Sequence, residues 1–245
     1  RSTDFNMTAN KAPSDGVITG YGVIDDKLVY VYSQDASVLN GTVGEMHAKK
    51  ITRLYDLAMK TGAPVIGLVD CAGIRLQEAT DALEAFGQIY LKQTLASGVI
   101  PQITAIFGTC GGGMAVIPSL TDFTFIESKK GKMFINTPNA LEGNNADKCD
   151  TAAASFQSEN NGCVDGIGSE DDIIADIRAL VSMLPLNNEG DVYTDSCEDD
   201  LNRACNSMAD MKADPRFLLS ELSDDHVSLR QRKTLPRIWL QVLLN

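Results

Sequence analysis

Apolar residues occur in two kinds of pattern along this chain, short uninterrupted runs and longer stretches with helical spacing. The runs at residues 65–69 and 99–107 are almost wholly apolar and rich in β-branched residues. Such runs are typical of strands that are buried on both faces of a parallel sheet. Helical spacing marks residues 45–60 and 79–95. The side chains of the second helix that we expect to face inward are Leu83, Phe86, Ile89 and Tyr90.

The remaining elements continue the order of strand, turn and helix. A hairpin is predicted by the runs at residues 16–24 and 28–33, which an Asp-Asp-Lys turn joins. Ser169, followed by three acidic residues, is a typical helix start, and Pro185 closes that helix. Crossovers of this length connect parallel strands, so the chain is predicted to have an α/β fold. Later strands are expected at residues 121–126, 132–136 and 164–167.

A triple-glycine turn follows one of the buried strands. The stretch at residues 108–113 reads Gly-Thr-Cys-Gly-Gly-Gly, and the apolar residues 114–117 can open a buried helix behind it. Such a turn leaves backbone N–H groups without partners, and glycine lets the backbone take positive φ and lets a ligand approach closely. The helix start adds partial positive charge. The turn therefore predicts a site for a negatively charged oxygen, as in an oxyanion hole.

Composition excludes several other functions. The net charge of −12 argues against a sequence-independent nucleic-acid binder, which needs a basic face. No apolar run approaches the ~18 residues that a membrane span needs. None of the six cysteines forms a C-x-x-C pair, and no metal ligand set is evident. Cys71 and Cys110 flank apolar strands and are expected to be reduced, buried thiols, which favours a cytoplasmic location.

Five blocks of sequence occur in a specific order. They cover residues 42–51, 62–66, 70–78, 95–102 and 108–122. Together they resemble the acyl-CoA carboxyltransferases, the β subunits of propionyl-CoA carboxylase and of related biotin-dependent carboxylases and decarboxylases, glutaconyl-CoA decarboxylase included. Each glycine turn alone is a weak signal, but the ordered combination is specific. The similarity extends over about residues 4–227.

The resemblance implies a crotonase-like fold of repeated ββα units, of which this chain is the N-terminal, acyl-CoA-binding half. Residues 1–227 are then the carboxyltransferase domain, and residues 228–245 are a basic, leucine-rich tail. That tail is expected to be either a docking helix or sequence foreign to the domain. The half that holds biotin in the family is missing from this sequence.

The resemblance also implies roles for the two glycine turns. Gly112 and Gly113 are the pair that supplies N–H groups to the thioester oxygen of an enolate, and the alternative is a tight structural turn. The amides of Ala72 and Gly73 are expected to shape the acyl pocket, unless that segment is a plain loop. Arg75 is expected to bind substrate, or else to brace the turn together with Gln77 and Glu78.

The phosphates of coenzyme A, which is part of the substrate, need cations. Lys49, Lys50 and Arg53 lie together in the first helix and are the expected phosphate ligands, although a solvated helix face explains them equally well. A second set of candidate cations is Lys129, Lys130 and Lys132.

No general base stands out in the sequence. The chain has two histidines, His47 and His226, and no base is placed to activate Cys110 as a nucleophile. In the resembling family biotin itself takes the α-proton. The implied partners are the biotin-binding second half, a biotin carrier protein and further copies of the chain. The alternatives are a free-standing crotonase-type isomerase, hydratase or hydrolase, with Glu78 and Glu142 as candidate bases, and a non-catalytic CoA-binding fragment.

Overall fold

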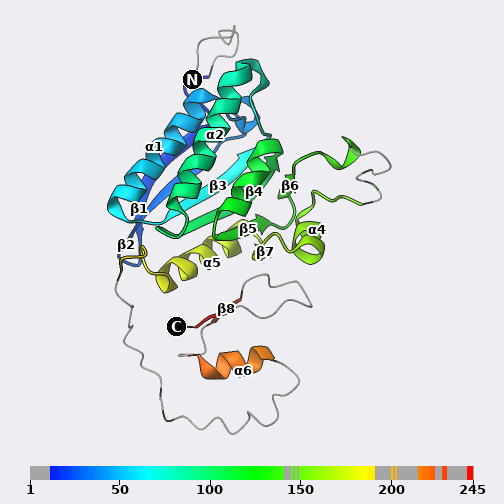
Figure 1. The fold of residues 1–245 in the computed structure, drawn as a ribbon. Helices are drawn as coiled ribbons and strands as arrows, with labels where there is room; N and C mark the ends of the chain where they lie inside the picture. Colours follow the sequence, from blue (N-terminus) through cyan, green and yellow to red (C-terminus); the bar gives the residue numbers. More distant parts are fainter. Residues whose placement is uncertain are drawn as a thin grey trace.

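A computed structural model describes residues 12–140, 145, 147, 149–190, 200, 202, 215–223, 228–230 and 242–244. Within these residues one seven-stranded sheet organises the chain (Figure 1). All of its pairings are parallel except that of β1 with β2. The strand order is β1 (Val17–Ile24), β2 (Lys27–Gln34), β3 (Val65–Cys71), β4 (Gln102–Gly111), β5 (Phe123–Glu127) and β7 (Gly166–Gly168), with β6 (Lys132–Phe134) on the end of β4.

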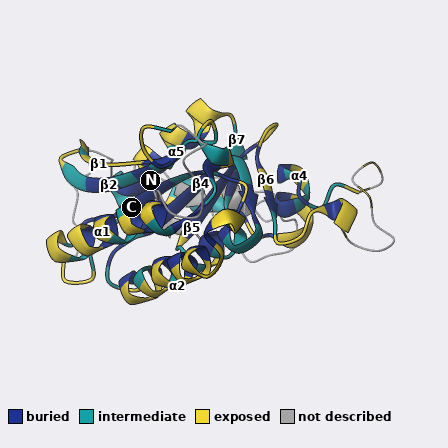
Figure 2. Ribbon diagram, turned by 90° about the horizontal axis from the view of Figure 1, so that it is seen from above, coloured by how far each residue is buried: buried dark blue, intermediate teal, exposed yellow. Residues whose placement is uncertain are grey.

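Helices cover both faces of the sheet. Helices α1 (Glu45–Thr61) and α2 (Ala79–Ala96) lie side by side on one face, and α5 (Glu170–Met183) packs on the other (Figure 1). The strands between these layers are mostly buried, whereas the outer faces of α1 and α2 are exposed (Figure 2). This double cover explains why β3 and β4 read as continuous apolar runs.

Strand β4 shows how one run serves two cores. Ile103 and Ala105 pack toward α5, while Ile106 and Cys110 pack toward α1 and α2. Helix α5 begins at the predicted cap, because Ser169 forms a reciprocal capping box with Asp172. The predicted strands and long helices are therefore confirmed, with boundaries shifted by a few residues.

Short elements complete the chain. Single turns of helix occupy Leu39–Gly41, Leu76–Glu78, Gly112–Val116, Pro138–Ala140 and Gln157–Asn161. The other short elements are α3 (Ile117–Leu120), α4 (Ala154–Phe156), α6 (Pro215–Leu222), β8 (Ser228–Arg230) and β9 (Val242–Leu244).

One expectation about these elements is wrong. Leu83 is 65% exposed on α2, although Phe86 and Ile89 are buried as predicted. The helix periodicity identified an apolar position but not the side of the helix that faces the sheet. In the tail, β8 and β9 pair as antiparallel strands, so these described residues do not form a docking helix.

A bulge interrupts the pairing of β3 with β4 just before their carboxyl ends. The register shifts between Val69 and Cys71. The Asp70 carboxylate fills the gap and accepts the Thr109 N–H at 2.9 Å. A Cβ atom at Gly108 would lie 2.3 Å from that carboxyl group, so any larger residue there would displace the Asp70 side chain. Bulges bend a strand and redirect the residues after it, and here the redirected segment is the triple-glycine turn.

Candidate functional site

Two glycine turns meet where β3 and β4 end. A Cβ atom added to Gly73 would lie 3.0 Å from the carbonyl oxygen of Gly111, and one added to Gly111 would lie 2.9 Å from that of Ala72. The backbones are therefore in contact, and a side chain at Gly73 or Gly111 would force them apart. Gly73 also has a φ of +121°, a conformation that other residues rarely adopt. The carboxyl ends of adjacent parallel strands thus form one continuous corner, as predicted.

Gly112 and Gly113 begin the helical turn Gly112–Val116 and present free backbone donors. Within the described residues neither N–H has a hydrogen-bond acceptor. This agrees with their place at a helix start, where the first N–H groups have no partner inside the helix. Both glycines are partly exposed, and a Cβ atom added to Gly112 would meet no atom of the described residues within 4 Å. The corner is open, and its donors are available to an oxyanion.

Tyr90 fixes the other side of this turn. Its hydroxyl donates to the carbonyl oxygen of Gly113 at 2.5 Å, and its ring packs beside that of Phe86. Burial raises the pKa of Tyr90, with a further contribution from Cys110, so the hydroxyl stays protonated and acts as a donor. The sequence predicted Tyr90 as an inward residue but not as a support of the glycine turn.

The turn at Ala72 and Gly73 has less to offer a ligand. The Ala72 N–H donates to the carbonyl oxygen of Asn40 at 3.0 Å, so this amide is not available to hydrogen-bond a ligand. The Gly73 N–H lies 3.3 Å from the Cys71 sulfur, which is a weak acceptor. Its role in the acyl pocket stays a prediction. The side chain of Ala72 is exposed at the corner.

Arg75 does not reach substrate, and this expectation is also wrong. Its side chain is 1% exposed and donates to Asp15, Glu78 and the carbonyl oxygen of Thr42. The alternative, that Arg75, Gln77 and Glu78 brace the turn, agrees with the contacts of Arg75 and Glu78, whereas Gln77 is exposed. Glu78 is fully buried and holds both Arg75 and the Glu45 N–H, so it is not free to serve as a base. Glu142 and His226 lie outside the described residues.

The comparisons with known proteins agree with this geometry. Residues 1–227 match the family model described as the carboxyl transferase domain. The chain belongs to this family. It is 44% identical over 206 residues to the methylmalonyl-CoA decarboxylase subunit alpha of Propionigenium modestum, covering 82% of this chain and 40% of that protein. It is 41% identical over 192 residues to the propionyl-CoA carboxylase beta chain of Roseobacter denitrificans, covering 77% and 38%.

Solved structures place the carboxyl transferase domain in the predicted fold class. Transcarboxylase 12S with methylmalonyl-CoA and methylmalonic acid bound superposes with a TM-score of 0.90 at 29% identity, covering 99% of this chain and 49% of that chain. The beta subunit of geranyl-CoA carboxylase from P. aeruginosa gives a TM-score of 0.64 at 25% identity, covering 88% and 43%. The crotonase-like α/β fold is thus confirmed. The chain spans less than half the length of the curated relatives named above.

The predicted phosphate ligands of the domain differ in exposure and in whether their side chains already have partners. Lys49 is exposed and pairs with Glu45 one turn earlier on α1. Lys50 bends back and donates to the carbonyl oxygen of Val17 at 2.9 Å. Arg53 is exposed. Lys49 and Arg53 therefore remain candidates, whereas Lys50 is already hydrogen-bonded to the sheet edge.

The second set of cations lies at the turn between β5 and β6. Lys130 pairs with Glu170 at 3.3 Å, and Lys132 pairs with Asp150 at 3.5 Å, both near the surface. Because β6 pairs with β4 from Thr109 onward, this turn lies at the same end of the sheet as the glycine corner. Exposed ion pairs are weak, so these lysines could exchange partners with a phosphate.

The thiols at the corner are unsuited to nucleophilic chemistry. Cys71 and Cys110 are both free and fully buried, as predicted. Burial raises the pKa of Cys71 to about 11 and that of Cys110 well above its ordinary value. A thiol held protonated at neutral pH is a poor nucleophile.

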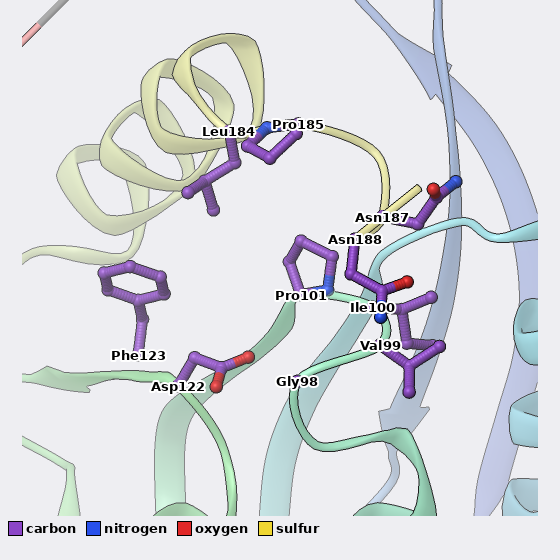
Figure 3. A pocket seen from close by; sticks show the side chains of 10 residues that line it. All are labelled: Gly98, Val99, Ile100, Pro101, Asp122, Phe123, Leu184, Pro185, Asn187 and Asn188. Carbon is purple, nitrogen blue, oxygen red and sulfur yellow. The ribbon is translucent and has the colours of Figure 1, made fainter. Parts of the chain in front are cut away.

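A largely apolar pocket of about 350 Å³ lies at the other end of the sheet (Figure 3). Pro101 precedes β4 and Asp122 precedes β5, so the pocket opens at the amino ends of these strands. Phe123 and Leu184 form part of its wall. The pocket is therefore separate from the glycine corner.

Within the described residues no helix is long and apolar enough to cross a membrane.

Proposed function

We propose that this chain is the acyl-CoA-binding half of a biotin-dependent carboxyltransferase or decarboxylase. Its membership of the carboxyl transferase family supports this function. The relatives named above are a methylmalonyl-CoA decarboxylase subunit and a propionyl-CoA carboxylase chain. Both names specify acyl-CoA thioesters, so we expect the substrate to be a short acyl-CoA. The family match supports the main function over a free-standing crotonase-type hydratase.

The chemistry proposed for the corner is stabilisation of an enolate. Moving a carboxyl group to or from the α-carbon of a thioester leaves negative charge on the thioester oxygen. Gly112 and Gly113 present two N–H groups at a helix start that have no acceptor in the part of the chain that the structure describes, which is the arrangement that such an oxygen needs. These two free donors are the observation that carries the proposal.

The carboxyl group is exchanged, in this proposal, with biotin held on a partner protein. The open space beside Gly112 leaves room for reacting groups from outside this chain. The Glu78 carboxylate is buried and accepts hydrogen bonds from Arg75 and the Glu45 N–H, and the thiols of Cys71 and Cys110 are buried. We therefore assign this chain the tasks of binding the thioester and stabilising its oxyanion. Proton transfer is left to groups outside the described residues.

We further propose that residues 1–227 form the carboxyltransferase unit and residues 228–245 a separate tail, which the range of the family match supports. A second, biotin-binding half, a biotin carrier protein and further copies of the chain are the proposed partners. The hexamer of transcarboxylase 12S supports an oligomer. The cytoplasmic location stays a prediction.

The function is tested by supplying the missing parts. The chain is mixed with methylmalonyl-CoA, biotin and the biotin-binding half of a relative, and transfer of labelled carboxyl to biotin is measured. We expect transfer with both halves and none with this chain alone. Hydration of an enoyl-CoA by the chain without biotin would overturn the proposal in favour of a hydratase. Tight binding of CoA with no transfer under any condition would reduce the chain to a binding module.

A further inference from the structure

A cluster of buried polar side chains lies beneath the glycine corner and has no place in the proposed chemistry. Its members are Asp15, Gln34, His47, Arg75 and Glu78, none more than 7% exposed. Charged side chains are rarely buried unless they are paired, because removing them from water is costly. A cluster of this size therefore has a specific set of contacts, and these contacts lead to both glycine turns.

The first of two chains of contacts through this cluster is centred on Arg75, and we call each of these chains an arm. Its guanidinium contacts Asp15 at 2.5 and 2.9 Å, Glu78 at 2.9 Å and the carbonyl oxygen of Thr42 at 2.6 Å. Burial alone would raise the pKa of Asp15, but the hydrogen bonds and positive charge of Arg75, together with the nearby His47 ring, outweigh it and hold that pKa well below its usual range. Asp15 is thus a carboxylate, and Arg75 is its counter-ion.

The same arm fixes the turn that contacts the glycine corner. The backbone N–H of Arg75 donates to the carbonyl oxygen of Val43 at 2.9 Å, and the N–H of Val43 donates to that of Gly73, also at 2.9 Å. Glu78 accepts the N–H of Glu45 at 2.7 Å, the first residue of α1. The turn is therefore hydrogen-bonded to the segment that leads into α1, and the Arg75 side chain contacts both Thr42 and Glu78.

The second arm leads to the helical turn that carries the free donors. His47 Nδ1 lies 3.5 Å from the Asp15 carboxylate, and His47 Nε2 lies 3.1 Å from Gln34 Nε2. Gln34 Nε2 also donates to the Met114 sulfur at 3.7 Å. Met114 follows Gly113 directly and is fully buried. Asp15 thereby lies between the two turns: it is hydrogen-bonded to Arg75 on one side and in close contact with the His47 ring on the other, where Nδ1 has no hydrogen-bond partner within the described residues.

We propose that the Asp15–Arg75 pair positions the two glycine turns relative to each other, and that Arg75 is a positioning residue for the oxyanion site. This inference rests on the proposed function, because it concerns the same corner. The physical reason is that oxyanion donors act only when they are held in place before the reaction. The pair lies below the corner and reaches both turns through contacts that no single strand pairing supplies.

The test uses the full chain in two variants and a control. R75K keeps the positive charge but lacks the planar fork with which Arg75 contacts both oxygens of Asp15. D15N leaves the Arg75–Glu78 contact in place, so it stays informative if R75K does not fold. K92M is the control, because it breaks a partly exposed ion pair between Lys92 on α2 and Asp56 on α1.

Two readouts follow the corner itself without any substrate. We expect the hydrogen-bonded amides of Val43 and Ala72 to exchange on the order of tenfold faster in R75K, while α5 amides such as Leu180 exchange as in wild type. The amide resonances of Gly112 and Gly113 are expected to shift in both variants but not in K92M. Equal acceleration across the molecule, or unmoved glycine resonances in both variants, would overturn the positioning role.

A third readout connects the pair to the ligand. The affinity for methylmalonyl-CoA is expected to fall on the order of tenfold in R75K and D15N, and the affinity for free CoA to fall less, since only the thioester meets the corner. Equal losses for both ligands would contradict the positioning role. If the wild-type chain binds neither ligand, the proposed function fails, and the amide readouts still decide whether Asp15 and Arg75 position the corner.

Discussion

Replacing Gly113 by proline tests the oxyanion site more directly than any bulky substitution. Proline removes one backbone N–H, and that N–H has no acceptor within the described residues. Gly113 lies in the first turn of its helix and does not have positive φ, so its own backbone does not exclude proline, but proline also restricts the preceding residue, Gly112, whose φ is +60°. The matched control is Gly113→Ala, which adds the same Cβ but keeps the donor.

The expected difference between the two variants follows from the contacts of that Cβ. It would lie 3.0 Å from the Tyr90 hydroxyl and 3.5 Å from the Phe86 ring in either variant. Crowding of this kind costs about 1–3 kcal/mol of folding stability, and it should affect both variants similarly. Loss of one oxyanion donor costs ~2.7–4 kcal/mol in the transition state, or about 10²–10³ in turnover. Only proline should show that second loss.

The assay is carboxyl transfer from methylmalonyl-CoA to biotin with the biotin-binding half supplied, next to urea unfolding of each variant. The expected result is a gap of at least about 10² in kcat between Gly113→Pro and Gly113→Ala at similar stability. Adding Tyr90→Phe to both variants removes the 3.0 Å contact but also the hydrogen bond to the Gly113 carbonyl, so turnover should fall in both while proline stays the slower of the two. If proline and alanine give the same turnover, the Gly113 N–H stabilises no oxyanion and the reasoning is refuted.

Three further outcomes are expected from the structure. Gly108→Ala should lower the free energy of unfolding by about 1–3 kcal/mol, because its Cβ would meet the Asp70 carboxyl at 2.3 Å, whereas Gly20→Ala, with open space, should change urea unfolding little. Lys49→Gln should weaken CoA binding in titration calorimetry more at low salt than at high salt, and a salt-independent loss would contradict a phosphate contact. Burial lowers the pKa of His47, so the imidazole binds a proton more tightly in the unfolded chain than in the folded one. The free energy of unfolding should therefore not depend on His47 above about pH 6.5, and should fall below that pH by at most ~1.4 kcal/mol per pH unit. His47→Gln should flatten this dependence, and parallel stability curves would contradict the burial argument.

The parts of the site that the sequence predicted are those that local chemistry determines. The strand predicted at residues 65–69 is β3 (Val65–Cys71), because its length and apolar content admit few alternatives. The triple glycine was predicted to leave free donors, since a helix start behind a strand always has unpartnered N–H groups. Gly112 and Gly113 indeed have no acceptor within the described residues.

The parts that were missed depend on contacts between distant residues. Arg75 was expected at the substrate because a cation next to a glycine turn can either bind substrate or brace the turn. Its main partner, Asp15, lies 60 positions away and belongs to a segment with no periodic pattern. The prediction that Leu83 faces inward was wrong for a related reason. Helical spacing marks an apolar position without showing which face of the helix the sheet covers.

The direction in which the donors point is likewise a non-local property. Asp70 bonds Thr109 across 39 positions, and Gln34 reaches Met114 across 80. The first contact bends the end of β4, and the second holds the helical turn behind the glycines. A chain with the same three glycines but without these side chains would still have free N–H groups, yet nothing would aim them at one oxygen. Because preorganised direction is what makes such donors effective, the glycine motif alone cannot establish an oxyanion site, and the side chains beneath it decide whether one exists.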